Sequence, residues 1–246
     1  MGNVIGIFSA KGGVGKTILA TNLTVALGVG HRRRTVLIDL NPGIGTADLL
    51  LDLEPGNSWG DLIPVIDELS PKHLKLAVTE YRPGVDLLAA PPEMTWKHPL
   101  TKKNINSLLE LLRNEYELVV LDNSSGSGGI ASETLSLADI RLITLTPDAP
   151  CLRATARFLE ALPEKEKFTG LVINQFAPGA AIKPDEISEH LGERLFGVMP
   201  IDPAGVWANI SYGEPCALKR TNKLGKSIRQ LAARLVKLTD QIGTTG

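Results

Sequence analysis

One stretch decides the fold of this 246-residue chain: Ala10-Lys11-Gly12-Gly13-Val14-Gly15-Lys16-Thr17. An apolar run precedes it and a helix-like segment follows it, from Ile18 to Leu27. In that strand–loop–helix setting, the glycines let backbone N–H groups cradle phosphates, and the helix start adds its positive dipole end. Lys16 is expected to reach the β- and γ-phosphates, and the Thr17 hydroxyl to bind Mg²⁺. The stretch therefore predicts a nucleotide-binding loop, although Ala10 stands where the general pattern has glycine.

Apolar runs alternate with helical patterns along the whole chain, which predicts a parallel sheet with helices on both faces. Strands are expected near residues 4–9, 35–39, 85–89, 117–122, 141–146, 169–174 and 196–199, and the main helices at about 16–28, 101–114, 150–162 and 223–242. The chain has no internal repeat and no low-complexity linker. We therefore expect one α/β domain over residues 1–246, with a mostly parallel twisted sheet of about seven or eight strands.

Composition and charge limit the classes of partner. The formal net charge of −1 gives no overall attraction to nucleic acid or to an anionic membrane. The only dense basic run, His31-Arg32-Arg33-Arg34, is expected to be a solvated turn rather than a binding patch. The two cysteines, Cys151 and Cys216, lack the spacing of a metal site or a disulfide scaffold.

Membrane segments are not expected. No apolar run approaches the length of a transmembrane helix, and the N-terminus lacks the pattern of a secretory signal. The last helix has an apolar stripe at three- and four-residue intervals, made of Ile228, Leu231, Leu235, Leu238 and Ile242. We expect this stripe to pack on the core rather than to lie on a membrane, and the chain to be cytoplasmic.

The KGGVGKT signature resembles the deviant Walker A loop of the ParA/MinD superfamily. Residues 35–39 lead into 40–48, which resembles that superfamily's switch I, and residues 118–122 lead into 123–126, which resembles Walker B and switch II. The resemblance covers nearly the whole chain and implies a P-loop ATPase. Within the superfamily, residues 45–62 and 87–92 look most like the pilus-assembly branch called CpaE/TadZ.

The resemblance implies roles for two aspartates and for the extra lysine. Asp122 would be the Walker B carboxylate that holds a magnesium-bound water, and Asp39 would add a second carboxylate near the same ion. A turn or helix-cap role is the alternative for each aspartate. Lys11 would cross the interface of an ATP-dependent homodimer and touch the partner's nucleotide, unless it is only a surface lysine at the loop entrance.

Asn41 departs from the superfamily pattern. Relatives read Asp-x-Asp, and their second aspartate positions the attacking water, whereas this chain reads Asp39-Leu40-Asn41. Because an amide is a far weaker proton acceptor than a carboxylate, hydrolysis is expected to be slow or nearly absent while ATP binding survives. In switch II, Ser124 and Ser125 are candidates to hydrogen-bond a water or the γ-phosphate, or are polar loop residues.

The candidate base contacts come from late in the chain. Asn174 closes a strand and resembles the superfamily's adenine-contacting asparagine, with an Asx-turn as the alternative. Pro200 and Asp202 would lie on the other side of the base, and Ile18 would complete the loop's set of nucleotide contacts. ATP is expected over GTP, since no Asn-Lys-x-Asp motif is present.

Three functions remain open at this level. The first is an ATP-switched dimeric ATPase that positions a pilus or secretion apparatus through a protein partner, recruited to a pole or to the inner face of the membrane. The second is a MinD-type or flagellar-number-type regulator with at most peripheral membrane association, or a ParA-type DNA partition ATPase. The third, motivated by Asn41, is a scaffold that binds ATP without hydrolysing it.

Overall fold

The computed structural model describes residues 1–92, 100–126, 128–163 and 167–243. Within them, one eight-stranded sheet has the strand order β3-β4-β2-β5-β1-β6-β7-β8. The strands are β1 (Asn3–Phe8), β2 (Thr35–Asp39), β3 (Thr79–Arg82), β4 (Val85–Leu88), β5 (Leu118–Asp122), β6 (Ile140–Leu145), β7 (Phe168–Phe176) and β8 (Arg194–Pro200). All neighbouring strands run parallel except the β3–β4 pair. The predicted α/β fold with a mostly parallel sheet is confirmed.

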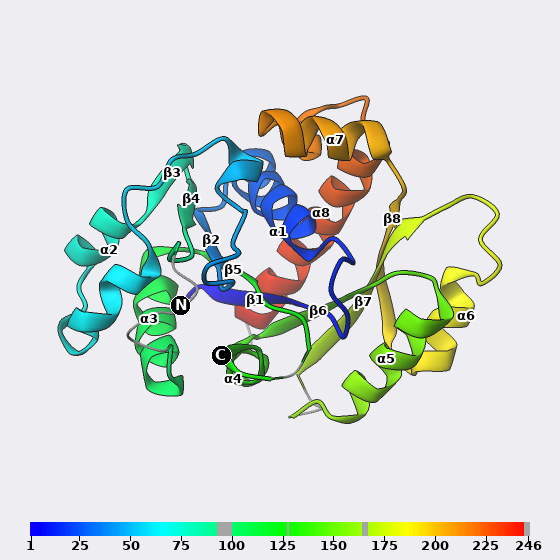
Figure 1. Ribbon diagram of the computed structural model, residues 1–246, viewed down its shortest axis with the longest axis horizontal. Coiled ribbons are helices and arrows are strands. Elements are labelled where there is room, and N and C mark those ends of the chain that lie inside the picture. Colours follow the sequence, from blue (N-terminus) through cyan, green and yellow to red (C-terminus); the bar gives the residue numbers. More distant parts are fainter. Residues whose placement is uncertain (93–99, 127, 164–166, 244–246) are drawn as a thin grey trace.

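Helices lie on both faces of this sheet (Figure 1). They are α1 (Lys16–Val25), α2 (Pro71–Ala77), α3 (Lys102–Glu115), α4 (Ile130–Leu137), α5 (Ala149–Glu160), α6 (Pro184–Leu191), α7 (Pro203–Tyr212) and α8 (Lys223–Gly243). One π-helix, η1 (Ala26–Gly30), continues α1, and three 3₁₀ segments are η2 (Leu49–Leu51), η3 (Trp59–Glu68) and η4 (Cys216–Leu218). The predicted helix over 16–28 therefore begins as an α-helix and ends as a π-helix.

Two aliphatic cores sandwich the sheet. Because successive side chains of a strand point to opposite faces, Val4 and Phe8 of β1 pack into one core, and Ile5 and Ile7 into the other. The first core lies under α3, α4 and α5, and the second under α1 and α8 (Figure 1). Strands covered on both faces need continuous apolar runs, which is the pattern these strands carry.

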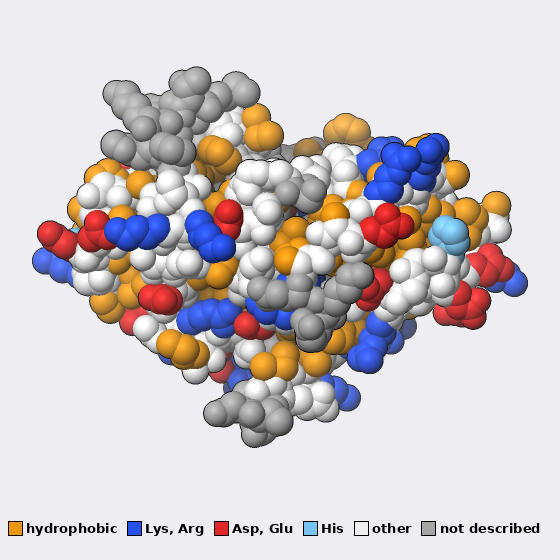
Figure 2. All heavy atoms as spheres, turned by 90° about the horizontal axis from the view of Figure 1, so that it is seen from below, with side chains coloured by type: hydrophobic (Ala, Val, Ile, Leu, Met, Phe, Trp, Pro, Cys, Tyr) orange, Lys and Arg blue, Asp and Glu red, His pale blue; other side chains and the backbone are white. Residues whose placement is uncertain are grey.

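The last helix packs on the second core, as predicted. Ile228, Leu231 and Leu235 are buried, Leu238 is half-buried against them, and only Ile242 at the helix end is exposed. None of the helices in the described ranges is long and apolar enough to cross a membrane. On the face shown in Figure 2, basic and acidic side chains are interspersed with hydrophobic ones, in keeping with the near-neutral charge.

Strand register positions the polar residues at one edge of the sheet. Ile7 of β1 lies opposite Asp122 of β5, and Asp122 lies opposite Asp39 of β2. Since these strands are parallel, their carboxyl ends meet at the same edge, beside the loop that leaves β1. This register alone brings the two predicted carboxylates next to the candidate phosphate loop.

Candidate functional site

The glycines of the loop have a backbone that only glycine adopts easily. Gly13 and Gly15 have φ of 76° and 87°, in the left-handed region. A Cβ on Gly15 would also lie 2.5 Å from Nδ2 of Asn174. That amide donates to the carbonyl oxygen of Val14 at 2.7 Å, so the end of β7 holds the loop in place.

Lys16 begins α1 with its side chain turned inward. Its Nζ donates to Oγ of Ser9 at 2.8 Å and to Oγ of Ser125 at 2.7 Å. Burial lowers the pKa of Lys16, and the nearby charge of Asp122 partly opposes that shift. Because both hydroxyl partners are neutral, a phosphate anion held by the loop would supply the counter-charge that this ammonium lacks.

Thr17 and the two aspartates form the next layer. Thr17 Oγ1 donates to Asp122 Oδ2 at 2.7 Å. The Asn41 side-chain amide donates to Asp39 Oδ1 at 2.8 Å and to Asp122 Oδ2 at 3.1 Å. Direct hydrogen bonds therefore connect the four residues that the sequence assigned to magnesium and to switch I, namely Thr17, Asp39, Asn41 and Asp122.

The donor set fits Mg²⁺. Oδ1 of Asp122 is buried and has no hydrogen-bond partner among the described residues, although an unpaired buried carboxylate oxygen is costly. It lies beside the Thr17 hydroxyl, and hydroxyl and carboxylate oxygens are ligands that Mg²⁺ accepts together with waters and phosphates. No group of three or more His, Cys, Asp or Glu side chains within the described ranges forms a metal cage by itself. Nucleotide phosphates would have to complete the coordination.

Both aspartates have a raised pKa. Burial, and secondarily the charge of Asp39, raises the pKa of Asp122 to about 7. Burial also raises the pKa of Asp39, while hydrogen bonds from Asn41, Ala47 and Thr46 oppose the rise. The backbone N–H groups of Thr46 and Ala47 donate to Asp39 Oδ2 at 3.1 and 3.2 Å. Asp39 therefore also holds the far end of switch I, and its Oδ1 accepts from the backbone N–H of Asn41 at 3.1 Å, which fits the turn-forming role considered for it.

Trp59 joins the switch I segment to the same site. Its indole Nε1 donates to the backbone carbonyl of Asp39 at 2.8 Å, and the ring is buried. Sequence reasoning assigned no site role to Trp59, because the contact depends on how the chain folds back after η2. The segment that follows switch I is thus anchored on the strand end that carries Asp39.

Switch II divides into a structural and a site-facing part. Asn123 is fully buried, donates to the carbonyl of Ile7 at 3.2 Å, and accepts from Thr134 at 2.6 Å. It therefore joins β1 to α4 rather than facing the loop. Ser125, in contrast, accepts from Lys16 Nζ at 2.7 Å, so it faces the loop, and its hydrogen bond to a water or to the γ-phosphate stays a prediction.

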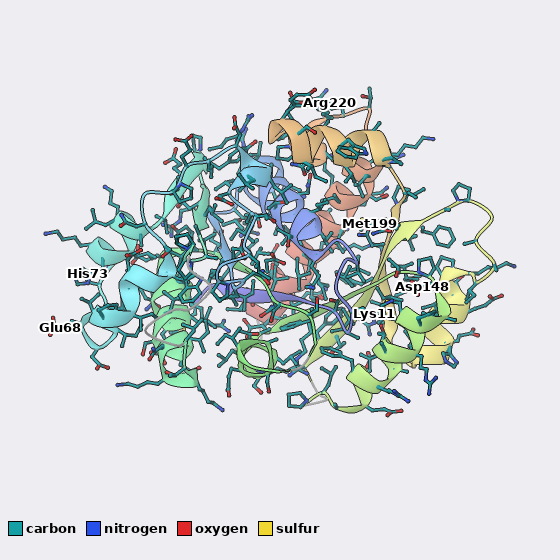
Figure 3. All side chains as sticks on the ribbon, viewed as in Figure 1. Lys11, Glu68, His73, Asp148, Met199 and Arg220 are labelled. Atoms are coloured by element: carbon teal, nitrogen blue, oxygen red, sulfur yellow. The ribbon has the colours of Figure 1, made fainter. Side chains whose placement is uncertain are left out.

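Lys11 lies on the outer side of the loop. Its side chain is exposed, and its charge helps, after the hydrogen bond from Thr146, to lower the pKa of Asp148. Figure 3 shows Lys11 and Asp148 near one another at the start of α5. Within one chain, Lys11 is therefore separate from Lys16 and available to another molecule.

A largely apolar pocket adjoins the loop on the side of α7. Its lining brings together the predicted base contacts Asn174, Pro200 and Asp202 with Ile18, which was predicted as a nucleotide contact of the loop. The remaining contributors, which sequence reasoning missed, are chiefly Met199, Val206, Leu224 and Ile228. Their only sequence signal is an apolar side chain at a helix or strand position, which does not distinguish a pocket wall from a core.

Two polar residues of this pocket also have structural tasks. The Asn174 amide binds Val14, and its Oδ1 accepts from the N–H of Gln175 at 2.9 Å. Asp202 caps α7 by accepting from Gly205 N at 3.0 Å, and it accepts from Asn222 at 2.6 Å. These hydrogen bonds hold both side chains in the pocket wall. The Asn174 oxygen bonds the next residue and not the one two positions on, so it does not form the Asx-turn considered for it.

Most of the chain matches a known protein-family model. Residues 5–215 match the model described as "CobQ/CobB/MinD/ParA nucleotide binding domain". The matched range contains the loop, both aspartates and the pocket residues up to Val206. The match therefore covers the whole candidate site except the part of the pocket wall that α8 provides.

Similar proteins span the full chain. The septum site-determining protein MinD of Bacillus subtilis is 27% identical over 243 residues, which is 96% of this chain and 90% of that protein. The MinC:MinD cell division complex of Aquifex aeolicus gives a TM-score of 0.81 at 26% identity, with 96% of each chain covered. A ParA family ATPase from Chlorobium tepidum gives a TM-score of 0.85 at 22% identity, with 95% of this chain and 98% of that chain covered.

Proposed function

The chain belongs to the CobQ/CobB/MinD/ParA nucleotide-binding domain family, and from that membership we propose that it is an ATP-switched dimeric ATPase that positions a larger cellular assembly. One observation carries the nucleotide part of the proposal: Lys16 is buried against hydroxyls at 2.7 and 2.8 Å, beside an aspartate oxygen that lacks a partner. Mg-ATP would supply both the anion that faces Lys16 and the cation that this aspartate oxygen can bind.

Each residue of the site would have a defined task. Lys16 and the backbone N–H groups of Gly13 and Gly15 neutralise and orient the phosphates, and Thr17 with Asp122 holds the ion. Bound Mg²⁺ would neutralise charge that develops on the β- and γ-phosphates. The apolar pocket beside Ile18 would take the base, with ATP as the expected nucleotide.

Turnover is proposed to be slow. Asn41 directs its N–H group at Asp39 and Asp122, and an amide cannot take a proton from an attacking water. Its hydrogen bonds also hold the two carboxylates at the strand ends, so the site keeps its shape without an active base at this position. We infer that this chain favours a long-lived ATP-bound state over rapid cycling.

Dimerisation would depend on ATP through Lys11. This lysine is exposed on the loop that cradles the phosphates, so a second molecule facing the loop would bring its own Lys11 near the nucleotide. Pairing two cationic loops is unfavourable unless phosphate anions lie between them. A homodimer would therefore form with ATP and dissociate without it.

The assembly is proposed to be a pilus or secretion apparatus, through a protein partner. The matched relatives are MinD and ParA-type proteins, which supports a positioning regulator in general. The pilus assignment rests on the CpaE/TadZ-like stretches 45–62 and 87–92. In this chain the first of them carries Trp59, whose indole bonds the carbonyl of Asp39, so the stretch is tied to the switch.

A second candidate is favoured by one specific observation. Because Asn41 replaces the water-positioning aspartate, the chain is alternatively a scaffold that binds ATP and does not hydrolyse it. A MinD-type regulator or a ParA-type partition ATPase is the other alternative within the family. Neither changes the expected roles of Lys16, Thr17 or Asp122.

The decisive experiment measures binding, dimerisation and turnover on the same samples. ATP hydrolysis and molar mass by light scattering are recorded with Mg-ATP and with Mg-ADP, for the wild type, Lys16→Ala and Lys11→Ala. Lys72→Ala, an exposed lysine on α2, is the matched control.

We expect an ATP-dependent dimer with slow turnover in the wild type and in the control. Lys16→Ala should lose nucleotide binding, and Lys11→Ala should bind nucleotide as a monomer. A dimer that forms equally well without nucleotide would contradict the switch. No turnover above the Lys16→Ala background, with dimerisation intact, would favour the scaffold.

A further inference from the structure

Four arginines line one hollow on the edge of the sheet opposite to the loop. Arg32, Arg33 and Arg34 precede β2, and Arg82 ends β3 just before the start of β4. Val29, Pro83 and two glycines complete the lining, and none of the lining residues is acidic. We call this feature the arginine hollow. Because β2 and β4 are parallel, it lies at their amino ends, whereas the nucleotide loop lies at carboxyl ends.

The two turns that carry these arginines are locked together. The backbone N–H of Thr35 donates to the carbonyl of Gly84 at 2.9 Å. Gly28 packs so closely on β4 that a Cβ there would lie 2.1 Å from Val85 Cγ2. The first turn follows the π-helix η1, and Arg32 has a left-handed φ of 54°, which is unusual for a residue with a side chain. The arginines therefore come from a rigid base and not from a freely moving loop.

The positive charge of the hollow is only partly balanced. Arg33 pairs with Glu117 at 2.9 Å and with Asp240 at 2.7 Å. The charges of Arg33 and Arg34 contribute to lowering the pKa of Glu117, so this carboxylate serves both. Arg32, Arg34 and Arg82 make no ion pair with the described residues, and Arg82 lies over the Tyr81 ring at 5.4 Å.

This concentration of charge contrasts with the rest of the chain. The sequence has a net charge of −1, yet four arginines converge where like charges repel. Glu117 serves Arg33 and Arg34, whereas Arg32 and Arg82 have no carboxylate partner among the described residues. A run of arginines alone would be a solvated turn, as the sequence suggested. However, Arg82 joins the run from a segment far away in sequence, and none of the lining residues is acidic. A solvated turn does not explain these two features.

We propose that the arginine hollow is a binding site for a phosphate-bearing anion, separate from the nucleotide loop. Guanidinium groups match the oxygens of a phosphate with paired hydrogen bonds, and several of them would share its charge. Its arginines come from two adjoining turns and not from a long track, which suits a terminal phosphate better than an extended nucleic-acid backbone. Val29, 39% exposed, and Pro83 offer an apolar margin for the rest of the ligand. A small phosphorylated molecule and a phospholipid headgroup share this chemistry.

The test uses pyrophosphate as the probe, on the full chain with ADP in excess so that the nucleotide loop is filled. Binding is measured by calorimetry and by the amide NMR shifts of Gly28 and Gly84. The double variant Arg32→Gln/Arg82→Gln removes two of the three arginine charges that make no ion pair within the described part of the chain. Arg153→Gln/Arg157→Gln, which removes two exposed arginines of α5, is the charge-matched control.

We expect saturable binding in the wild type and in the control, about tenfold or more weaker in the Arg32/Arg82 variant. Co-sedimentation with phosphatidylglycerol vesicles, compared with phosphatidylcholine vesicles, identifies the source. Vesicle binding lost in the same variant indicates a lipid headgroup, and pyrophosphate binding without vesicle binding indicates a free phosphorylated ligand.

Three outcomes would overturn the proposal. They are the absence of saturable pyrophosphate binding, an equal loss in both double variants, and binding to DNA alone. The far-UV circular dichroism and melting temperature of each variant show that it is folded. Since ADP fills the loop throughout, these outcomes do not depend on whether the chain hydrolyses ATP.

Discussion

Asn41 joins Asp122 across two parallel strands, with its side-chain amide 3.1 Å from Oδ2 of the carboxylate. The same amide lies 3.2 Å from the backbone carbonyl of Asp122. An aspartate at this position would bring a third carboxylate to a buried pair. The Asn41 amide therefore stabilises the nucleotide-free site. Because an amide replaces a carboxylate here, this position also lacks a group that could accept a proton from the attacking water.

Asn41→Asp should speed ATP hydrolysis, by about tenfold or more, because a carboxylate can orient and deprotonate the attacking water. The same change should lower the melting temperature without Mg²⁺, since three carboxylates would then repel one another. Steady-state phosphate release and thermal melts with and without Mg-ADP measure both effects. Asn114→Asp, an exposed change of equal charge on α3, is the control. Unchanged turnover would remove Asn41 as the reason for slow hydrolysis.

Stability without Mg²⁺ should depend on pH through Asp122. Its pKa is raised from 3.8 to about 7, so the folded state holds this proton more tightly than the unfolded state. The stabilising contribution is complete below about pH 4 and is lost as the pH rises toward 7, after which it stays constant. Urea unfolding of the wild type and of Asp122→Asn, at a series of pH values with a chelator, isolates the difference. An equal pH dependence in the two proteins would contradict the assignment.

Gly15→Ala should abolish tight nucleotide binding while the fold survives. The new Cβ would sit 2.5 Å from Nδ2 of Asn174, in a backbone conformation with φ of 87°. Either Asn174 moves and releases the Val14 carbonyl, or the loop opens, and both changes disturb the phosphate cradle. Gly30→Ala is the control, because a Cβ there meets nothing within 4 Å. ADP titration by calorimetry should show a loss of at least about tenfold for Gly15→Ala alone.

Asn209→Ala should destabilise the protein by about 1–3 kcal/mol, the usual cost of leaving buried polar groups unpaired. The buried Asn209 amide donates to the carbonyl of Leu50 at 2.8 Å and accepts from Asn22 at 2.7 Å, so it links α7 to η2 and α1. Urea denaturation measures the change, with Asn114→Ala, an exposed residue, as the control. A loss below about 0.5 kcal/mol would show that the network relaxes or takes up water.

The seven expected strands were predictable because each carries an apolar run, and the central strands are buried on both faces. β5 illustrates this, since all five residues from Leu118 to Asp122 are buried and adjoin the switch II residues. β3 escaped prediction: its four residues alternate in burial at the sheet edge, and it pairs antiparallel. α7 also escaped, because its uncharged sequence lacks the polar stripe that marks a surface helix.

The candidate site was predictable where chemistry and sequence position coincide, as at Lys16, Thr17 and Asp122. It was not predictable where topology brings distant residues together. Leu224 and Ile228 reach the apolar pocket beside the loop only because α8 returns beside α1, and Arg82 meets Arg32 only because β4 pairs with β2. Such long-range contacts depend on the order of the strands in the sheet, which local patterns of apolar and polar residues do not encode.

The bond from the Trp59 indole to the Asp39 carbonyl has a practical consequence. The ring is 2% exposed, so its fluorescence should lie toward the blue, whereas Trp207 is 66% exposed and should emit further to the red. The chain has a third tryptophan, Trp96. With both Trp96→Phe and Trp207→Phe, the remaining emission comes from Trp59 and reports on the strand end that carries Asp39. Movement of switch I on nucleotide exchange could then be followed in real time, without attaching a dye to the protein.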